Sequence, residues 1–260
     1  MDFMSVDCHF HIFDKDVINP AIARYAVSNS ASLSEWLSLA NAEGITHGVI
    51  VQPSFLGTDN TLLIDAIAKY PDRLKGIAVV DPAITKNELQ ALQNKGIRGV
   101  RLNLSEDPKP LETITRNQVL MGHLKDLNMH LQIHHDDGLL NTLLLHLPLG
   151  LQIVIDHFGR PKSNTEFLTQ SSGIDRHQQN LWVKLSAPYR TPHLNHRAIY
   201  QYWLNKLGSA RLVWGSDWPH TRHEHKQNYA NQVRQLQALS DDENLKSNIL
   251  KTNPLALYWS

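Results

Sequence analysis

Ser5-Val6-Asp7-Cys8-His9-Phe10-His11-Ile12 is the stretch that decides the fold, because it has the pattern of a strand and carries two histidines two positions apart. Side chains alternate between the two faces of a strand, so Asp7, His9 and His11 are predicted to share one face. Cys8 would then lie on the opposite face as a buried, unreactive thiol. The Cα atoms of the two histidines would stand about 6.5–7 Å apart, close enough for both rings to contact one small ligand or metal. The alternative is that both histidines are hydrogen-bonded polar residues at a strand end.

Strand-like runs alternate with helical runs along the rest of the chain. Alternating strands and helices predict a parallel sheet, and eight such units in about 250 residues is the size of a (β/α)₈ barrel. The predicted strands are 5–12, 45–51, 74–80, 97–104, 129–134, 151–157, 181–186 and 211–216. The predicted helices are 32–42, 60–69, 86–94, 118–127, 138–147, a partly helical 162–176, 196–207 and, in a C-terminal tail, 228–239 and 242–250. An open, doubly wound α/β sheet is the alternative.

The position of the polar residues favours a closed barrel over an open sheet. They follow the carboxyl ends of the predicted strands, where barrel active sites lie. Closure makes the eighth strand the neighbour of the first, about 4.8 Å away, so Asp217 would face His9 and His11. We therefore predict one (β/α)₈ TIM-barrel domain over 1–260, with a C-terminal helical tail and a long loop, 14–30, over the site.

Composition excludes several classes of function. Lys+Arg and Asp+Glu both number 25, so no excess charge attracts the chain to nucleic acid or to an anionic membrane. No apolar run approaches the roughly 18–20 residues that span a bilayer. The N-terminal residues lack the basic and apolar regions of a signal peptide, and the single cysteine excludes an intrachain disulfide. These features predict a cytoplasmic protein, and they leave the oligomeric state undefined.

Four residues at the ends of predicted strands are the main candidates for chemistry. Asp217 ends a buried strand, where a carboxylate is costly unless it is paired or functional; beside imidazoles it could deprotonate a water as general base or ligate a metal, and a helix N-cap is its structural alternative. His157 ends an apolar run and could polarise a carbonyl or carry a proton, unless it is a core histidine. Arg101 and Arg160 indicate an anionic substrate, because guanidinium groups bind carboxylates bidentately. Further candidates at the rim are Ser54, Tyr189, Arg190 and His220.

Three motifs in this order resemble the amidohydrolase superfamily. They are Asp7-Cys8-His9-Phe10-His11, Asp156-His157-Phe158-Gly159-Arg160-Pro161 and Gly215-Ser216-Asp217-Trp218-Pro219. Within the superfamily the chain resembles the amidohydrolase-2 type, in the branch of 2-pyrone-4,6-dicarboxylate lactonases and related lactone hydrolases. Gln52-Pro53-Ser54 and Gly99-Val100-Arg101-Leu102-Asn103 fit the same branch.

The resemblance implies a hydrolase that opens the ring of a small, carboxylated lactone by water attack on its carbonyl. Asp217 would match the water-activating aspartate, and His9, His11 and His157 the imidazoles around the carbonyl. The anion contacts would be Arg101, Arg160 and Ser54. Members of this branch work without a metal, the histidines replacing it as electrophile, so the resemblance implies no cofactor.

Two departures from the branch keep other functions open. The chain has Ser105-Glu106-Asp107 where a second arginine is expected, and His134 where the dicarboxylate lactonases carry tyrosine. His134 favours a second hypothesis, a mononuclear zinc-dependent hydrolase or decarboxylase with the ligands His9, His11, His134 and Asp217, which suit zinc. A non-catalytic anion-binding barrel is a third hypothesis, but pure binding needs no general base beside imidazoles.

Overall fold

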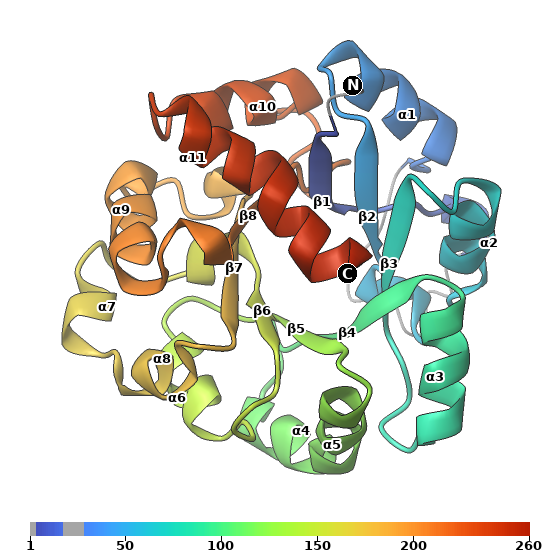
Figure 1. The fold of residues 1–260 in the computed structure, drawn as a ribbon, viewed down its shortest axis with the longest axis horizontal. Coiled ribbons are helices and arrows are strands. Elements are labelled where there is room, and N and C mark those ends of the chain that lie inside the picture. Colours follow the sequence, from blue (N-terminus) through green and yellow to red (C-terminus); the bar gives the residue numbers. More distant parts are fainter. Residues whose placement is uncertain (1–3, 18–28) are drawn as a thin grey trace.

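The computed structural model describes residues 4–17 and 29–260, which form a barrel of eight parallel strands surrounded by helices (Figure 1). Neighbours in sequence are neighbours in the sheet, in the order β1 (Val6–Phe10), β2 (His47–Val51), β3 (Leu74–Ala78), β4 (Ile97–Asn103), β5 (His130–His134), β6 (Ile153–Ile155), β7 (Leu181–Ser186) and β8 (Leu212–Gly215). The helices are α1 (Leu33–Ala42), α2 (Thr61–Lys69), α3 (Lys86–Asn94), α4 (Pro110–Arg116), α5 (Gln118–Asp126), α6 (Leu140–Leu145), α7 (Glu166–Thr169), α8 (Ser172–His177), α9 (His196–Leu207), α10 (Tyr229–Gln237) and α11 (Glu243–Ser247). The predicted (β/α)₈ barrel is confirmed, and the open sheet is excluded.

Local signals in the sequence explain where the helices begin. The Ser32 side chain accepts a hydrogen bond from the Glu35 backbone and caps α1. Thr85 and Glu88 form a reciprocal capping box at the start of α3. The predicted loop 14–30 falls mostly on 18–28, which lie outside the described residues. Within the described residues, no helix has the length and apolar character needed to cross a membrane.

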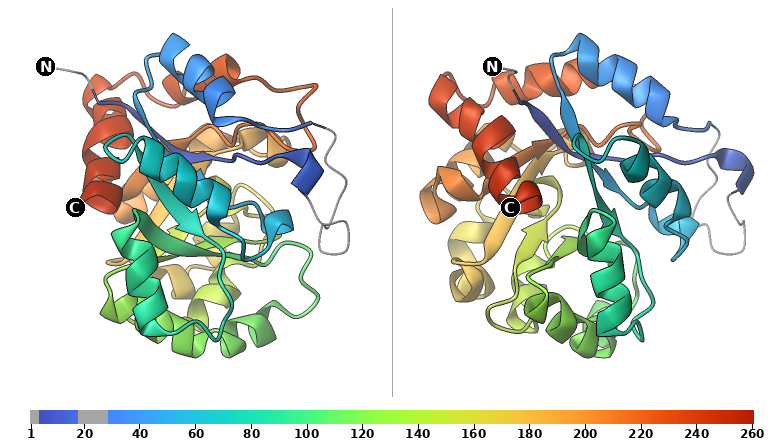
Figure 2. Two further views of the ribbon diagram at one scale, coloured as in Figure 1. Left: turned by 90° about the vertical axis from the view of Figure 1, so that its right-hand side faces the viewer. Right: turned by 45° about the vertical axis from the view of Figure 1, so that its right-hand side comes forward.

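Apolar side chains form two layers of core. The larger layer lies between the helices and the outside of the strands. Figure 2 shows how the helices surround the strands. The smaller layer fills the barrel interior with Val6, Cys8, Val49, Val51, Ile77, Val154, Trp182, Val213 and Tyr258. The apolar cluster closes the barrel interior, so the described residues leave no open pore through it. The polar residues described in the next subsection lie on top of this cluster and form the floor of a site.

The C-terminal segment covers the end of the barrel where the strands begin. Figure 1 shows this segment, which continues from α11, crossing the end of the barrel. Tyr258 belongs to the interior cluster, and its carbonyl accepts a hydrogen bond from Arg98 Nε at 3.0 Å. Trp259 Nε1 donates to the Asp72 carbonyl at 3.1 Å. The prediction that Trp259 packs back on the barrel is confirmed.

Strands β1 and β8 meet at a seam that the Asp7 side chain holds together. The Ser216 backbone N–H donates to Asp7 Oδ1 at 2.9 Å, and the Ser216 hydroxyl donates to Asp7 Oδ2 at 2.6 Å. Trp36 of α1 and Tyr229 of α10 also donate to Oδ2, each at 3.1 Å. Burial raises the pKa of Asp7, although these hydrogen bonds oppose the effect. One carboxylate thus joins both strands to two helices.

The prediction that Asp7 shares a face with His9 and His11 is wrong. Asp7 pairs with Gly48 and Phe10 with Ile50, so three residue steps of β1 lie opposite two steps of β2. Such a β-bulge breaks the alternation of side chains along a strand. Asp7 therefore points outward to the helices, whereas Cys8 lies in the barrel interior as a buried thiol whose pKa burial raises.

Candidate active site

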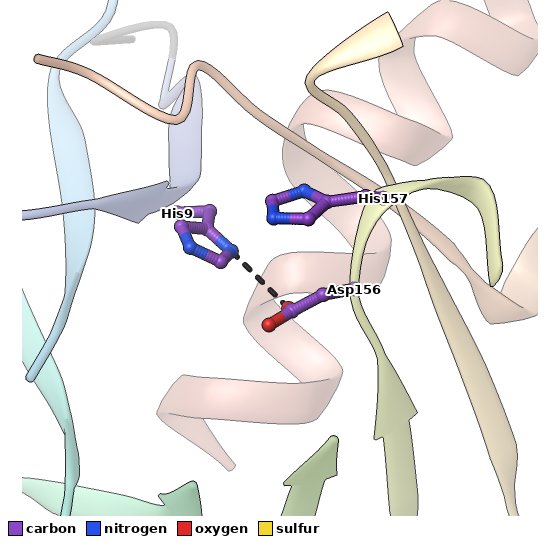
Figure 3. Close-up of side chains that lie close together, drawn as sticks. All are labelled: His9, Asp156 and His157. Carbon is purple, nitrogen blue, oxygen red and sulfur yellow. Dashed lines mark ion pairs between the residues drawn. The ribbon is translucent and has the colours of Figure 1, made fainter. Parts of the chain in front are cut away.

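Two histidines of the first strand region present the same ring atom to Asp217. His9 Nδ1 lies 3.2 Å from Asp156 Oδ1, and His11 Nδ1 lies 2.7 Å from the Val51 carbonyl oxygen (Figure 3 shows the His9 pair). Both partners can only accept, so both Nδ1 atoms carry a proton, and the Nε2 atom of each ring faces Asp217. These Nε2 atoms lie 3.6 and 3.5 Å from Asp217 Oδ1. Burial lowers the pKa of His9 to about 3, so its ring is neutral at pH 7.

The two oxygens of Asp217 have different surroundings. Oδ2 accepts hydrogen bonds from the Tyr189 hydroxyl at 2.5 Å and from Arg190 Nε at 2.8 Å. Oδ1 faces the imidazoles, including His157 Nε2 at 4.0 Å. Burial alone would raise the pKa of Asp217, but opposing effects, of which the charge of the Arg190 guanidinium is the largest, hold this pKa well below its usual range. Asp217 is therefore an anchored carboxylate with one oxygen available for chemistry, and it caps no helix.

His157 reaches the site because the backbone turns sharply after β6. Residues 157–160 all have positive φ angles, of 54°, 58°, 78° and 40°. As a result Asp156 and His157 both point toward His9 instead of alternating (Figure 3). Trp203 Nε1 holds the turn by donating to the Phe158 carbonyl at 2.9 Å. Residues held in sparsely populated backbone regions cluster at functional sites.

The His157 ring differs from the other two in its hydrogen bond. Its Nδ1 lies 2.9 Å from the Ser186 hydroxyl, which can donate as well as accept. When Ser186 donates, the neutral ring carries its proton on Nε2. Burial holds the pKa of His157 well below its usual value, so the ring is neutral. His157 is thus the one of these three imidazoles that can donate a hydrogen bond from Nε2 while uncharged.

A buried group of charged and polar side chains lies behind His9. Asp156 Oδ2 accepts from Gln132 Nε2 at 3.1 Å, and Gln132 Oε1 accepts from Lys184 Nζ at 2.7 Å. Lys184 Nζ lies 3.8 Å from Asp156 Oδ1, and Arg101 Nε lies 3.5 Å from Oδ2. Burial lowers the pKa of Lys184 to about 8. Sequence reasoning gave no role to Asp156 or Gln132; the position of Asp156 directly before His157 was the available signal.

A cavity of about 380 Å³ opens above these residues. Of the predicted site residues it is lined by His11, Ser54, Arg101, His134, His157, Arg160, Arg190 and Asp217. His9 lies beneath it and is fully buried. Tyr189 reaches the site through Asp217, and the buried His220 ring lies 5.8 Å from the Tyr189 ring without lining the cavity. Lining residues that sequence reasoning did not select are Pro53, Phe55, Asn103, Ser105, Glu106, Asp136, Thr221, Arg222 and His223.

His134 lies in the cavity wall rather than in the cluster around Asp217. Its Nε2 lies 3.2 Å from Arg160 Nη1, and its Nδ1 lies 3.1 Å from Asn103 Oδ1. Arg160 Nε in turn donates to Asp137 at 2.7 Å. Both ring nitrogens of His134 are therefore engaged along the wall. The predicted ligand set that included His134 is not brought together.

Other residues do have the arrangement of a metal site. Among the described residues, the ligand atoms of His9, His11 and Asp217 lie within 4.8 Å of one another, as do those of His9, Asp156 and His157. The first group fits a metal better, because the Nε2 atoms of both histidines lie 3.5–3.6 Å from Asp217 Oδ1. Ligand atoms around a tetrahedral zinc ion are separated by about 3.3–3.5 Å. The ion pair of His9 Nδ1 with Asp156 and the hydrogen bond of His11 Nδ1 to the Val51 carbonyl are the kind of supporting contacts that metal-bound histidines make.

The geometry can be compared with known proteins over nearly the whole chain. A 2-pyrone-4,6-dicarboxylate hydrolase of Comamonas testosteroni is 28% identical over 98% of this chain and 90% of that protein. A 4-sulfomuconolactone hydrolase of Rhizobium radiobacter is 28% identical over 97% and 89%. The crystal structure of a probable 2-pyrone-4,6-dicarboxylic acid hydrolase from Acinetobacter baumannii, with citric acid bound, is 33% identical, covers both chains completely and superposes with a TM-score of 0.87. The amidohydrolase family model matches residues 6–259, and the chain therefore belongs to the amidohydrolase family.

Proposed function

We propose that this protein hydrolyses a small lactone that carries a carboxylate, by attack of water on the ring carbonyl. The observation that carries the proposal is the asymmetry of Asp217. Tyr189 and Arg190 bind one carboxylate oxygen, and the other oxygen faces three imidazoles at the floor of the cavity. The names of relatives that match nearly the full chain, both of them lactone hydrolases, support the same reaction.

The cavity suits a small anion. Its volume lies in the usual range for pockets that bind small molecules. Arg101 and Arg160 line it and are the proposed contacts of the substrate carboxylate, with Ser54 as a further donor. The citric acid in the Acinetobacter baumannii structure is also a small carboxylate. Glu106 and Asp136 line the same cavity, and their negative charges would repel a second substrate carboxylate. They therefore favour a lactone with one carboxylate over a dicarboxylate.

Asp217 carries the proton in the proposed reaction, and His157 stabilises the charge that develops. Asp217 Oδ1 accepts a proton from water while the water oxygen bonds to the carbonyl carbon. His157 donates a hydrogen bond from Nε2, and keeps its proton, to the carbonyl oxygen on which negative charge develops, with Ser186 holding the ring in this tautomer. The ring C–O bond then breaks, and the proton held by Asp217 passes to the leaving oxygen. The products are the opened hydroxy or enol acid, and the enzyme returns to its initial state.

A metal-dependent hydrolase or decarboxylase is the second candidate function. It is favoured by the orientation of His9 and His11, whose Nδ1 atoms face acceptors and whose Nε2 atoms both face Asp217 Oδ1. These two rings and Asp217 would hold the ion. When bound, the ion would supply Lewis-acid polarisation of the substrate carbonyl. His157 and the arginines would keep the roles given above.

Metal content and a lactone panel together test the proposal. Purified protein is analysed for bound metals, and hydrolysis of carboxylated and neutral lactones is measured before and after exhaustive chelation. We expect carboxylated lactones to be opened, and the activity to survive chelation. Stoichiometric zinc, with activity lost on chelation and restored by zinc, would replace the first candidate by the second. Binding of these anions without turnover under either condition would indicate a non-catalytic barrel.

A further inference from the structure

Four side chains along one wall of the cavity form a continuous hydrogen-bonded chain. Arg160 contacts His134, His134 contacts Asn103, and Asn103 Nδ2 donates to Ser54 Oγ at 3.0 Å. The four residues come from three strand ends and the turn after β6, and all of them line the cavity. The proposed reaction uses Arg160 and Ser54 as substrate contacts, but it gives His134 and Asn103 no role.

The direction of every hydrogen bond in this chain is fixed by groups that can only donate. Arginine has no acceptor, so His134 Nε2 must accept from Arg160 and His134 Nδ1 must carry the ring proton. The Ser105 backbone N–H donates to Asn103 Oδ1 at 3.1 Å, which identifies this atom as the amide oxygen. His134 Nδ1 therefore donates to that same oxygen, and the Asn103 amide nitrogen faces Ser54.

The hydrogen-bonded row from Arg160 to Ser54 has a donor at each end that can reach a ligand in the cavity. Ser54 Oγ accepts from Asn103, so the hydroxyl hydrogen remains to donate to a ligand. At the other end Arg160 uses Nε for Asp137 and Nη1 for His134, and within the described residues Nη2 makes no hydrogen bond. The Arg160 side chain is 15% exposed, which keeps it accessible from the cavity.

We propose that His134 is a positioning residue that sets substrate specificity: it orients Arg160 directly, and Ser54 through Asn103, so that the wall presents two donors to a carboxylated lactone. This inference rests on the proposed lactone hydrolysis for its substrate class. His134 itself touches no reacting atom. Burial, with the charge of the Arg101 guanidinium, holds the pKa of His134 well below its usual value, which keeps Nε2 an acceptor for Arg160.

The tautomer of His134 gives a test that needs no substrate. Protein labelled with ¹⁵N-histidine is examined by two-bond ¹H–¹⁵N correlation spectra, and the His134 ring is assigned from the spectrum of His134→Gln. We expect a neutral ring with its proton on Nδ1. A proton on Nε2 would leave Arg160 Nη1 without its acceptor on His134 and would overturn the proposal.

Kinetics separate a positioning role from a structural one. His134→Phe should raise KM for a carboxylated lactone about tenfold or more, the effect of losing an ordered charge-assisted contact. It should change kcat, and the KM of a neutral lactone of similar shape, less than about threefold. His134→Gln, which keeps one acceptor and one donor, should restore much of the affinity. His177→Phe, at a buried histidine of α8 that bonds the Leu144 carbonyl away from the cavity, is the matched control for general packing damage.

A double-mutant cycle with Arg160→Met completes the test. Because His134 acts through Arg160, the effects of His134→Phe and Arg160→Met on KM should be far from additive. Additive effects, equal losses for charged and neutral lactones, or a loss confined to kcat would each overturn the proposal. If the wild-type protein opens no lactone, the proposed function fails, and the inference is then decided by the tautomer and by citrate affinity, which His134→Phe should weaken about tenfold and His177→Phe should not.

Discussion

Asp217→Asn removes the proposed base while it keeps the size of the side chain. In the folded protein Asp217 is almost completely buried and pairs with Arg190, whose Nε and Nη2 both lie 2.8 Å from Oδ2. Removing one partner of a buried ion pair costs about 3–5 kcal/mol. Arg190 is 19% exposed, so water replaces part of the lost interaction, and asparagine can still accept from Tyr189. We therefore expect a loss of unfolding free energy of about 2–3 kcal/mol.

The same change should have a larger effect on catalysis. Loss of a general base lowers turnover by about 10²–10⁴-fold, which corresponds to about 3–5 kcal/mol of activation free energy. The loss should appear in kcat, because asparagine leaves Arg101 and Arg160 in place to bind the substrate.

Two measurements check this prediction. Turnover is followed by ring opening of the best lactone from the panel, and stability by denaturant unfolding at neutral pH. Asp126→Asn, which removes an exposed carboxylate paired with Lys86, is the control and should change neither turnover nor KM noticeably. An Asp217→Asn protein that folds and turns over at a near wild-type rate would refute the assignment of Asp217 as the base.

Three further predictions concern binding, pH and packing. Arg101→Met should reduce kcat/KM for a carboxylated lactone by the equivalent of roughly 1–3 kcal/mol, and an equal loss for a neutral lactone would make Arg101 structural. Because the pKa of Asp217 is lowered, the acid limb of a kcat/KM profile should lie below the usual carboxyl range, and Arg190→Met should shift this limb to higher pH; a limb that Arg190→Met leaves unchanged would show that it does not report Asp217. A Cβ at Gly215 would lie 2.4 Å from His9 Cβ, so Gly215→Ala should lower the unfolding free energy by about 1–3 kcal/mol and reduce turnover, whereas an unaltered protein would show that β8 can shift freely.

The sequence predicted the parts of the site that follow from regular geometry. His9 and His11 were predicted to lie beside Asp217 because a barrel must bring its first and last strands together. Two backbone hydrogen bonds, from Asp217 N–H to the His9 carbonyl and from His11 N–H to the Trp218 carbonyl, join these segments in the structure. The position of Arg101 near the end of β4 likewise follows from where the strands of a barrel terminate.

The sequence did not predict the parts that depend on irregular backbone. The bulge in β1 turned Asp7 away from His9, and nothing in the local pattern marks that bulge. The positive φ angles at His157 and Arg160 are unusual for residues with a Cβ, and they direct Asp156 and His157 to one side. The partners of His134, Asn103 of β4 and Arg160 after β6, lie far from it in the sequence. The place of His134 in the cavity wall could therefore be found only from the structure.

The seam between β1 and β8 has a consequence for folding. Asp7 and Ser216, which bond across it, are 209 positions apart in the chain. Contacts of such long range form late and slowly, because the whole intervening chain must be ordered first. His9 and His11 lie on one side of this seam and Asp217 on the other, so an incompletely folded chain does not bring the proposed catalytic residues together. During refolding, turnover should therefore appear only after the helical signal has recovered.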